Sequence, residues 1–171
     1  GCGMPLTTGI GTVDAMRVGP DTGGYWIEKK GQLLRTGAMV GVRNSIRNSV
    51  VRGGMHNALW LNDPDCLMLR TEGTKLSPAQ RRTQINAIAL SGGILLYSDD
   101  FAKLSDELLG EIRVIQEIVG RCFHGRLMPL DMMARELPQI IYNTVGYLGI
   151  FNMERRERTV TVDGRYLLEQ A

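Results

Sequence analysis

The stretch Ile94-Leu95-Leu96-Tyr97-Ser98-Asp99-Asp100 joins four apolar residues directly to three polar ones. A long helical pattern lies on each side of it, over residues 77–93 and 105–119. Ser77 followed by Pro78 is a favourable helix start, and the glycine pair that closes the first pattern is a favourable stop. A short apolar strand between two helices is typical of a parallel sheet built from βα units.

The same pattern continues toward the N-terminus. Apolar runs at residues 12–18 and 58–61 each end in a turn, and a helical pattern between them covers residues 32–52. The end of one more run stands at Gly1-Cys2. Four strands make half of a (β/α)8 barrel, because a whole barrel needs roughly 250 residues. The predicted fold class is therefore α/β, with residues 1–125 as half of a catalytic barrel.

After Pro129 the pattern changes to short apolar runs joined by polar connections, at residues 140–142, 147–151 and 159–162. Such runs are typical of antiparallel strands. Residues 126–171 are therefore predicted to begin an antiparallel β domain. We also expect the chain to be a piece of a longer protein, since its first residues resemble a strand end, and its compartment stays open.

The composition excludes several classes of protein. Twenty Lys and Arg against 18 Asp and Glu give a net charge of +2, without the basic surface of a nucleic-acid-binding protein. The apolar runs are far shorter than the roughly 20 residues that span a bilayer. Three cysteines among 171 residues are too few, and odd in number, for a disulfide scaffold. A globular domain that contacts neither nucleic acid nor membrane is predicted.

Chemically capable side chains follow each apolar run. In a parallel βα barrel the loops after the strands meet on one face, and that face holds the active site. The residues in these positions are Cys2, Arg17, Asp21, Asn62, Asp63, Asp65, Ser98, Asp99 and Asp100.

Arg17 and Asp21 stand on the two sides of a Gly-Pro turn. Four residues apart, a guanidinium and a carboxyl group can point into one pocket, where the acid could protonate a leaving oxygen. The alternative is a salt bridge that only supports the turn.

Asp63 and Asp65 flank Pro64, which stiffens the turn. Their carboxylates could bind sugar hydroxyls or orient Arg17, or they could form an Asx turn that satisfies its own backbone. Ser98-Asp99-Asp100 is predicted to cap the following helix. Neither the carboxylates nor the cysteines and histidines have metal-ligand spacing, so no metal site is predicted.

Four segments, taken in order, resemble the α-galactosidases (melibiases) of the clan that unites glycoside hydrolase families 27 and 36, and family 36 most closely. The segments are residues 2–6, 13–22, 59–66 and 96–100. The resemblance implies a (β/α)8 barrel with an appended antiparallel β domain. It also implies a retaining hydrolase, without a cofactor, that removes terminal α-linked galactose from oligosaccharides of the raffinose and melibiose type.

The resemblance also implies roles for single residues. Asp21 matches the general acid/base, Arg17 a substrate-binding arginine, and Asp65 a carboxylate of the substrate pocket. Cys2 and Gly3 match a segment that contacts the sugar near its 2-hydroxyl group. The nucleophile of the family lies in a Lys-x-Asp segment on the preceding strand, so we expect it upstream of Gly1. The chain would then hold strands five to eight, and its partner would be the N-terminal half of the same protein.

Two other functions stay open. A relative in the same clan could act on another α-linked sugar or transfer galactose, and a half barrel could be a non-catalytic sugar-binding or structural protein. Association of identical subunits is also left open.

Overall fold

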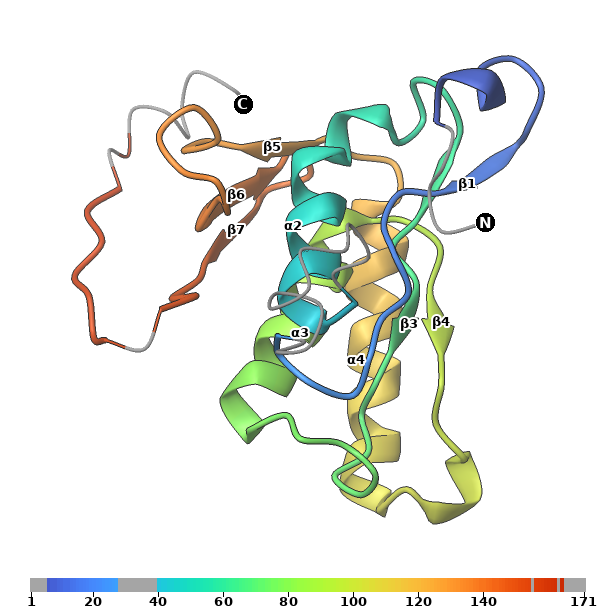
Figure 1. Cartoon of the computed structure of the whole chain (residues 1–171), viewed down its shortest axis with the longest axis vertical. Coiled ribbons are helices and arrows are strands. Elements are labelled where there is room, and N and C mark those ends of the chain that lie inside the picture. Colours follow the sequence, from blue (N-terminus) through green and yellow to red (C-terminus); the bar gives the residue numbers. More distant parts are fainter. Residues whose placement is uncertain (1–5, 28–39, 155, 163, 165–171) are drawn as a thin grey trace.

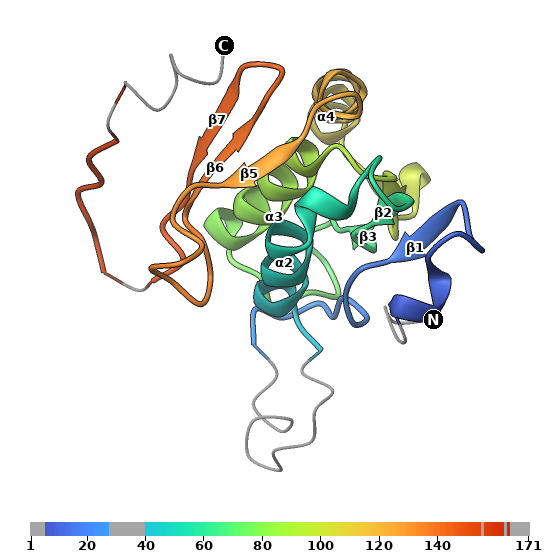
Figure 2. The same ribbon diagram turned by 90° about the horizontal axis from the view of Figure 1, so that it is seen from above.

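Three layers make up the structure, a computed structural model that describes residues 6–27, 40–154, 156–162 and 164. The helices α2 (Val42–Val51), α3 (Pro78–Ser91) and α4 (Asp106–Cys122) form the middle layer. Parallel strands lie on one side of the helices and an antiparallel sheet lies on the other (Figures 1 and 2).

The parallel strands follow the predicted βα order. Strand β1 (Ala15–Arg17) pairs with β2 (Leu61–Asp63), and β3 (Cys66–Leu67) pairs with β4 (Leu96–Tyr97). Helix α2 connects the first pair and α3 the second. The α/β class is confirmed, whereas the half barrel stays a prediction, and the strand expected at Gly1-Cys2 lies outside the described residues.

Strand β2 lies further along the chain than predicted. The expected break at Asn62 is wrong, because this residue is part of the strand and only 3% exposed. Its side chain accepts a hydrogen bond from Trp60 Nε1 and donates one to the Arg52 carbonyl, each 3.0 Å long. A polar residue can occupy a buried strand position when its hydrogen bonds are satisfied.

Helix α3 begins and ends where its sequence predicts. The Gln80 backbone N–H donates to Ser77 Oγ over 3.2 Å, and the Ser77 N–H donates to Gln80 Oε1 over 3.0 Å, which is a capping box. The helix ends at Gly92, whose φ of +66° is left-handed. A Cβ there would lie 2.3 Å from the Cys122 carbonyl oxygen, so glycine is required.

Helices α2 and α4 differ from their predicted bounds. The helix predicted over residues 32–52 begins in a part of the chain, residues 32–39, that lies outside the described residues. Within the described residues, α2 begins at Val42. Helix α4 begins after Ser105, whose Oγ accepts from the Leu108 N–H, and continues to Cys122, beyond the predicted end at Val119.

The antiparallel sheet has the order β5 (Leu127–Pro129), β6 (Ile140–Asn143) and β7 (Tyr147–Ile150). The strands predicted near β6 and β7 are confirmed. The strand predicted at residues 159–162 is wrong: this segment forms no strand and pairs with no strand of the described residues. Strand β5 was not predicted from the sequence.

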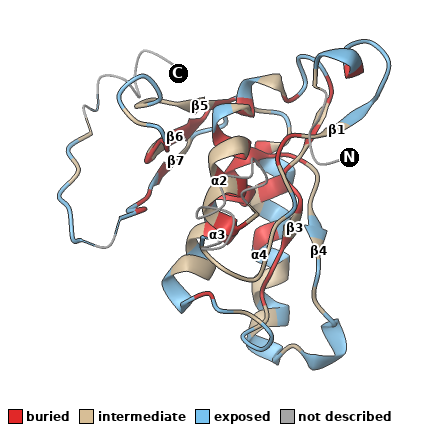
Figure 3. Ribbon diagram, viewed as in Figure 1, coloured by how far each residue is buried: buried red, intermediate tan, exposed pale blue. Residues whose placement is uncertain are grey.

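The sheet shares a hydrophobic core with the helices (Figure 3). Ile46 of α2, Leu90 of α3 and Ile141 of β6 belong to the same buried cluster. The fully buried Asn143 donates from Nδ2 to the carbonyls of Leu90 and Cys122, over 3.0 and 3.3 Å. The sheet is thereby fixed to the ends of two helices, and the division at residue 125 stays a prediction.

One face of the parallel strands is more open than the other. Leu67 of β3 and Tyr97 of β4 pack with Ile85 and Ile88 of α3. The neighbouring residue Leu96, which points to the opposite face because strand side chains alternate, is 41% exposed. Across the described chain, no helix is long and apolar enough to cross a membrane.

His56 connects the strand layer to the end of α4. It is 4% exposed, its Nδ1 accepts from the Asn62 N–H over 3.1 Å, and its Nε2 lies 3.0 Å from the Phe123 carbonyl oxygen. Because Nδ1 is an acceptor, Nε2 carries the proton and donates it. Burial lowers the pKa of His56, and the bond to Phe123 offsets part of this shift.

We predict that acid destabilises the fold through His56. The unfolded chain takes up a proton near pH 6.5, and the folded chain takes it up only at lower pH, so the unfolded state binds more protons in between. The contribution of neutral His56 is complete above about pH 6.5 and decreases as the pH falls toward the folded pKa. Urea unfolding midpoints of the full-length protein between pH 8 and 5 should show this loss.

The variant His56→Gln should be less stable than the wild type at pH 8 but should lose less between pH 8 and 5. The exposed His124 gives a matched control, because His124→Gln should keep the wild-type pH dependence. Equal acid sensitivity of His56→Gln and wild type would contradict the prediction.

Candidate functional site

The carboxyl ends of β1 and β2 bring the predicted charged residues together. Arg17 is the last residue of β1 and lies beside Asp63 in the strand register. Its Nη2 donates to Asp21 Oδ1 over 2.9 Å and also contacts Asp65 Oδ2. One guanidinium therefore links two carboxylates that are 44 positions apart in sequence, Asp21 and Asp65.

The two carboxylates have different surroundings. The Asp21 side chain is 63% exposed, that of Asp65 is 12% exposed, and that of Arg17 is 20% exposed. Asp65 Oδ2 also accepts from the Thr22 N–H over 2.5 Å. Asp21 thus faces solvent, whereas Asp65 is held inside by donors.

Asp65 has a left-handed backbone, with a φ of +73°. Asp63 Oδ1 accepts from its N–H over 2.8 Å, with Pro64 between the two residues. This is an Asx turn, one of the two alternatives that the sequence left open. Asp65 also contacts the Arg17 guanidinium, and whether it orients Arg17 for a substrate stays a prediction.

Helix α2 stabilises this turn through hydrogen bonds of Ser45. Thr22 Oγ1 lies 3.1 Å from Ser45 Oγ, which donates to the Pro64 carbonyl over 3.2 Å. Thr22 and Ser45 were not among the predicted site residues. The position of Thr22 directly after Asp21 was a usable signal, but a serine within an amphipathic helix gives none.

Asp99 and Asp100 have structural roles, and Asp100 caps a helix as predicted. The Asp99 carboxylate is fully buried, accepts from the N–H groups of Leu69 and Arg70, and pairs with the Arg70 guanidinium at 3.1 Å. Asp100 caps a short 3-10 helix, Phe101–Lys103. The predicted cap is thus confirmed for Asp100 in the next helix of the chain, whereas α4 begins with its own cap at Ser105.

The Cys66 thiol borders Asp65. Burial, followed by the hydrogen bond to Asp65 and the charge of that carboxylate, raises the pKa of Cys66 to about 11. The thiol is therefore protonated at neutral pH, which does not suit a nucleophile. The other predicted sugar-binding residues, Cys2 and Gly3, lie outside the described residues.

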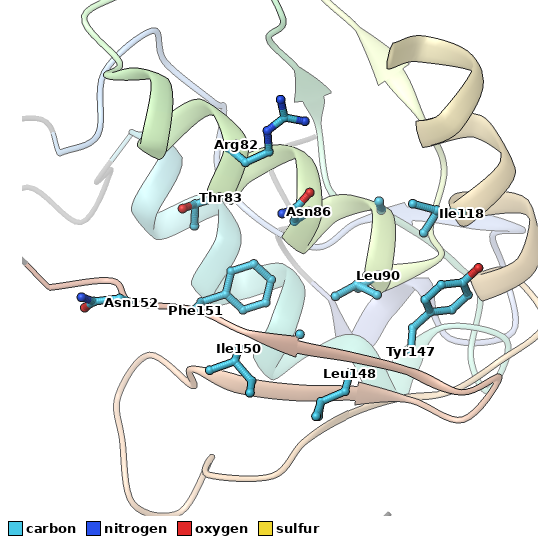
Figure 4. A pocket seen from close by; sticks show the side chains of 12 residues that line it. Arg82, Thr83, Asn86, Leu90, Ile118, Tyr147, Leu148, Ile150, Phe151 and Asn152 are labelled. Carbon is cyan, nitrogen blue, oxygen red and sulfur yellow. The ribbon is translucent and has the colours of Figure 1, made fainter. Parts of the chain in front are cut away.

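No three His, Cys, Asp or Glu side chains of the described residues gather so as to hold a metal ion. A hollow of about 420 Å³ lies elsewhere, between α3, α4 and β7 (Figure 4). Arg82, Asn86, Tyr147 and Phe151 are among its lining residues. Of the predicted site residues that the structure describes, Arg17, Asp21 and Asp65, none borders this hollow, so the charged cluster at the strand ends remains the candidate site.

Comparison with known proteins identifies what the chain is similar to. No protein-family model matches the sequence. The α-galactosidase from Thermus thermophilus, solved in complex with p-nitrophenyl α-D-galactopyranoside, superposes with a TM-score of 0.66 and 25% identity over 87% of this chain. The chain is similar to part of an α-galactosidase.

A second structure of that enzyme, in complex with stachyose, gives a TM-score of 0.60 and 30% identity over 67% of this chain. The matches cover 28% and 25% of the Thermus chains, so the present chain spans about a quarter of the enzyme's length. The resemblance to α-galactosidases inferred from the sequence is confirmed. The roles of the single site residues stay predictions.

We predict that Cys66 reacts slowly with iodoacetamide in the folded protein. With a pKa of about 11, only on the order of one thiol in a thousand is ionised at pH 8. The rate should rise about tenfold per pH unit between pH 7 and 10, because the thiolate is the reacting form. Mass spectrometry of the tryptic peptide spanning residues 53–70, which contains Cys66 alone, measures the rate.

The urea-unfolded protein is the control, since its Cys66 should have an ordinary pKa and react much faster at pH 8. If Cys66 reacted at pH 8 as fast in the folded protein as in the unfolded one, its pKa would not be raised by the fold, and the prediction would be wrong.

Proposed function

We propose that the chain is part of a retaining α-galactosidase that removes terminal α-linked galactose from oligosaccharides of the raffinose and melibiose type. The observation that supports this most is the Arg17 cluster: in a chain similar to an α-galactosidase, one guanidinium joins two carboxylates at adjoining ends of parallel strands. The carboxyl ends of barrel strands are where such folds hold their active sites.

Asp21 is the proposed general acid/base. Its carboxyl group is exposed and can reach a substrate, whereas the Asp65 side chain is only 12% exposed. Arg17 is proposed to bind the sugar, and Asp65 to complete the substrate pocket beside it. Cys2 and Gly3 are proposed to contact the sugar near its 2-hydroxyl group.

The proposed reaction has two steps. A nucleophilic carboxylate attacks the anomeric carbon while Asp21 donates its proton to the leaving oxygen, which gives a covalent glycosyl-enzyme. Asp21, now a carboxylate, takes a proton from water, and the water oxygen attacks the same carbon to release galactose. Retaining enzymes place the two carboxyl groups about 5–5.5 Å apart. We propose that the nucleophile comes from a part of the protein outside these 171 residues.

The complementary part is proposed to be the N-terminal half of the same barrel. The chain spans about a quarter of the Thermus enzyme, and its parallel strands leave Leu96 exposed on the face away from the helices. Residues 1–125 would supply strands five to eight, and residues 126–171 the first part of the β domain. We propose galactose as the sugar because both similar structures are of an α-galactosidase, in complex with p-nitrophenyl α-D-galactopyranoside and with stachyose.

We predict that Asp21→Asn affects two substrates of the full-length protein differently. A natural disaccharide has a poor leaving group that needs the proton, so its turnover should fall by ~10²–10⁴-fold. The phenolate of an aryl α-galactoside leaves without being protonated, so the first step should remain fast. The second step, attack of water on the glycosyl-enzyme, should slow. Stopped-flow measurement should show a burst of phenol, then a slow phase that azide accelerates.

Asp100→Asn is the matched control, because it removes the charge of another exposed carboxylate that follows a parallel strand. The turnover of both substrates should stay at the wild-type rate in this variant. Equal losses on both substrates for Asp21→Asn, without burst or azide rescue, would exclude Asp21 as the acid/base.

We predict that the isolated 171-residue chain associates or aggregates and hydrolyses no α-galactoside. Its open strand edges and its exposed apolar side chains, such as Leu96, favour association. No hydrolysis is expected because the proposed nucleophile lies outside these 171 residues. Size-exclusion chromatography and an aryl α-galactoside assay measure both properties, with the full-length protein as control. Turnover by the pure chain would refute the proposed origin of the nucleophile.

A further inference from the structure

The sequence from Leu61 to Leu67 changes its pairing partner at one point. Strand β2 pairs with β1, and strand β3, which follows it after two residues, pairs with β4. The two residues between them are Pro64 and the left-handed Asp65. The Asp63–Asp65 turn therefore connects the β1–β2 pair to the β3–β4 pair.

Asp63 acts on both sides of this turn. Its backbone carbonyl accepts from the Val18 N–H over 3.0 Å and thus fixes it to the end of β1. Its side-chain Oδ1 accepts from the Asp65 N–H over 2.8 Å. A left-handed backbone is unfavourable for residues other than glycine, and it persists where the surroundings hold it.

The consequence of this turn is the direction of the Asp65 carboxylate. In the left-handed conformation, Oδ2 reaches two donors that follow or end β1: the Thr22 N–H at 2.5 Å and the Arg17 guanidinium. An extended backbone at Asp65 would turn its side chain away from these donors. The Arg17 guanidinium would then retain only its contact with Asp21 at this site.

We propose that Asp63 is a positioning residue: its Oδ1 holds Asp65 in the left-handed conformation, and Asp65 in turn holds Arg17 for the substrate. The inference rests on the proposed function and adds to it a residue that touches no substrate. The required property is a hydrogen-bond acceptor at Oδ1, and the negative charge of Asp63 is not needed.

The test compares Asp63→Ala with Asp63→Asn in the full-length protein. Alanine removes the acceptor, and kcat/KM for an aryl α-galactoside should fall by about 100-fold, as expected when a substrate-binding group is misplaced. Asparagine keeps an acceptor oxygen suited to an Asx turn, and kcat/KM should stay within about threefold of wild type. Equal losses in both variants would overturn the proposal.

The matched control is Asn152→Ala. Asn152 Oδ1 accepts from the Glu154 N–H over 3.0 Å, which is the same i to i+2 hydrogen bond on the surface, far from the charged cluster in sequence. This variant should keep wild-type kcat/KM. Thermal unfolding of all variants separates loss of activity from loss of fold.

A double-mutant cycle tests whether Asp63 acts through Asp65. In an Asp65→Ala background, Asp63→Ala should lower kcat/KM no further, because the residue that it positions is gone. An additional loss of about 100-fold, as in the wild-type background, would show that Asp63 acts independently and would overturn the proposal.

Crystal structures of the wild type and Asp63→Ala provide a readout that does not depend on activity. The variant should lose the positive φ at Asp65 and the contact between Asp65 and Arg17. An unchanged turn would overturn the proposal even if the protein hydrolysed galactosides. A changed turn in a protein without galactosidase activity would support the positioning role and refute the proposed function alone.

Discussion

The contact of the Arg17 guanidinium with two carboxylates is the interaction on which the candidate site depends. Arg17 ends β1, Asp21 follows the turn after it, and Asp65 comes from the neighbouring strand stretch. Only parallel pairing places these groups at one edge, because parallel strands end on the same side. The short strands and the surrounding helices are thus arranged so that one positive charge joins two loops.

Buried hydrogen bonds stabilise the scaffold that carries this contact. Ser45 of α2 connects Thr22 to the Pro64 carbonyl, and Asn143 of β6 connects the ends of α3 and α4. Both side chains are almost fully buried, and a buried polar group that loses its partner is costly. Sites held by such hydrogen bonds on helices and strands keep their geometry better than sites on loops alone.

Local signals in the sequence predicted much of the fold, and long-range contacts account for what it missed. The capping box at Ser77 acts within one helical turn, so it placed α3 correctly. The strand position of Asn62 was missed because it depends on pairing with Met16 of β1, which is distant in sequence. In the site, the pairing of Arg17 with Asp21 followed from spacing, whereas that of Arg17 with Asp65 needed the strand register.

The different burial of the two carboxylates determines which chemistry each can support. A general acid must give its proton to a substrate atom and take another from water, so it needs access to the space outside the protein. Asp21 has this access. Asp65 accepts hydrogen bonds from Thr22 and Arg17, which keep its carboxylate in one place. A fixed charge next to an accessible carboxyl group orients the guanidinium between them, and the turn at Asp63 sets the direction of that charge.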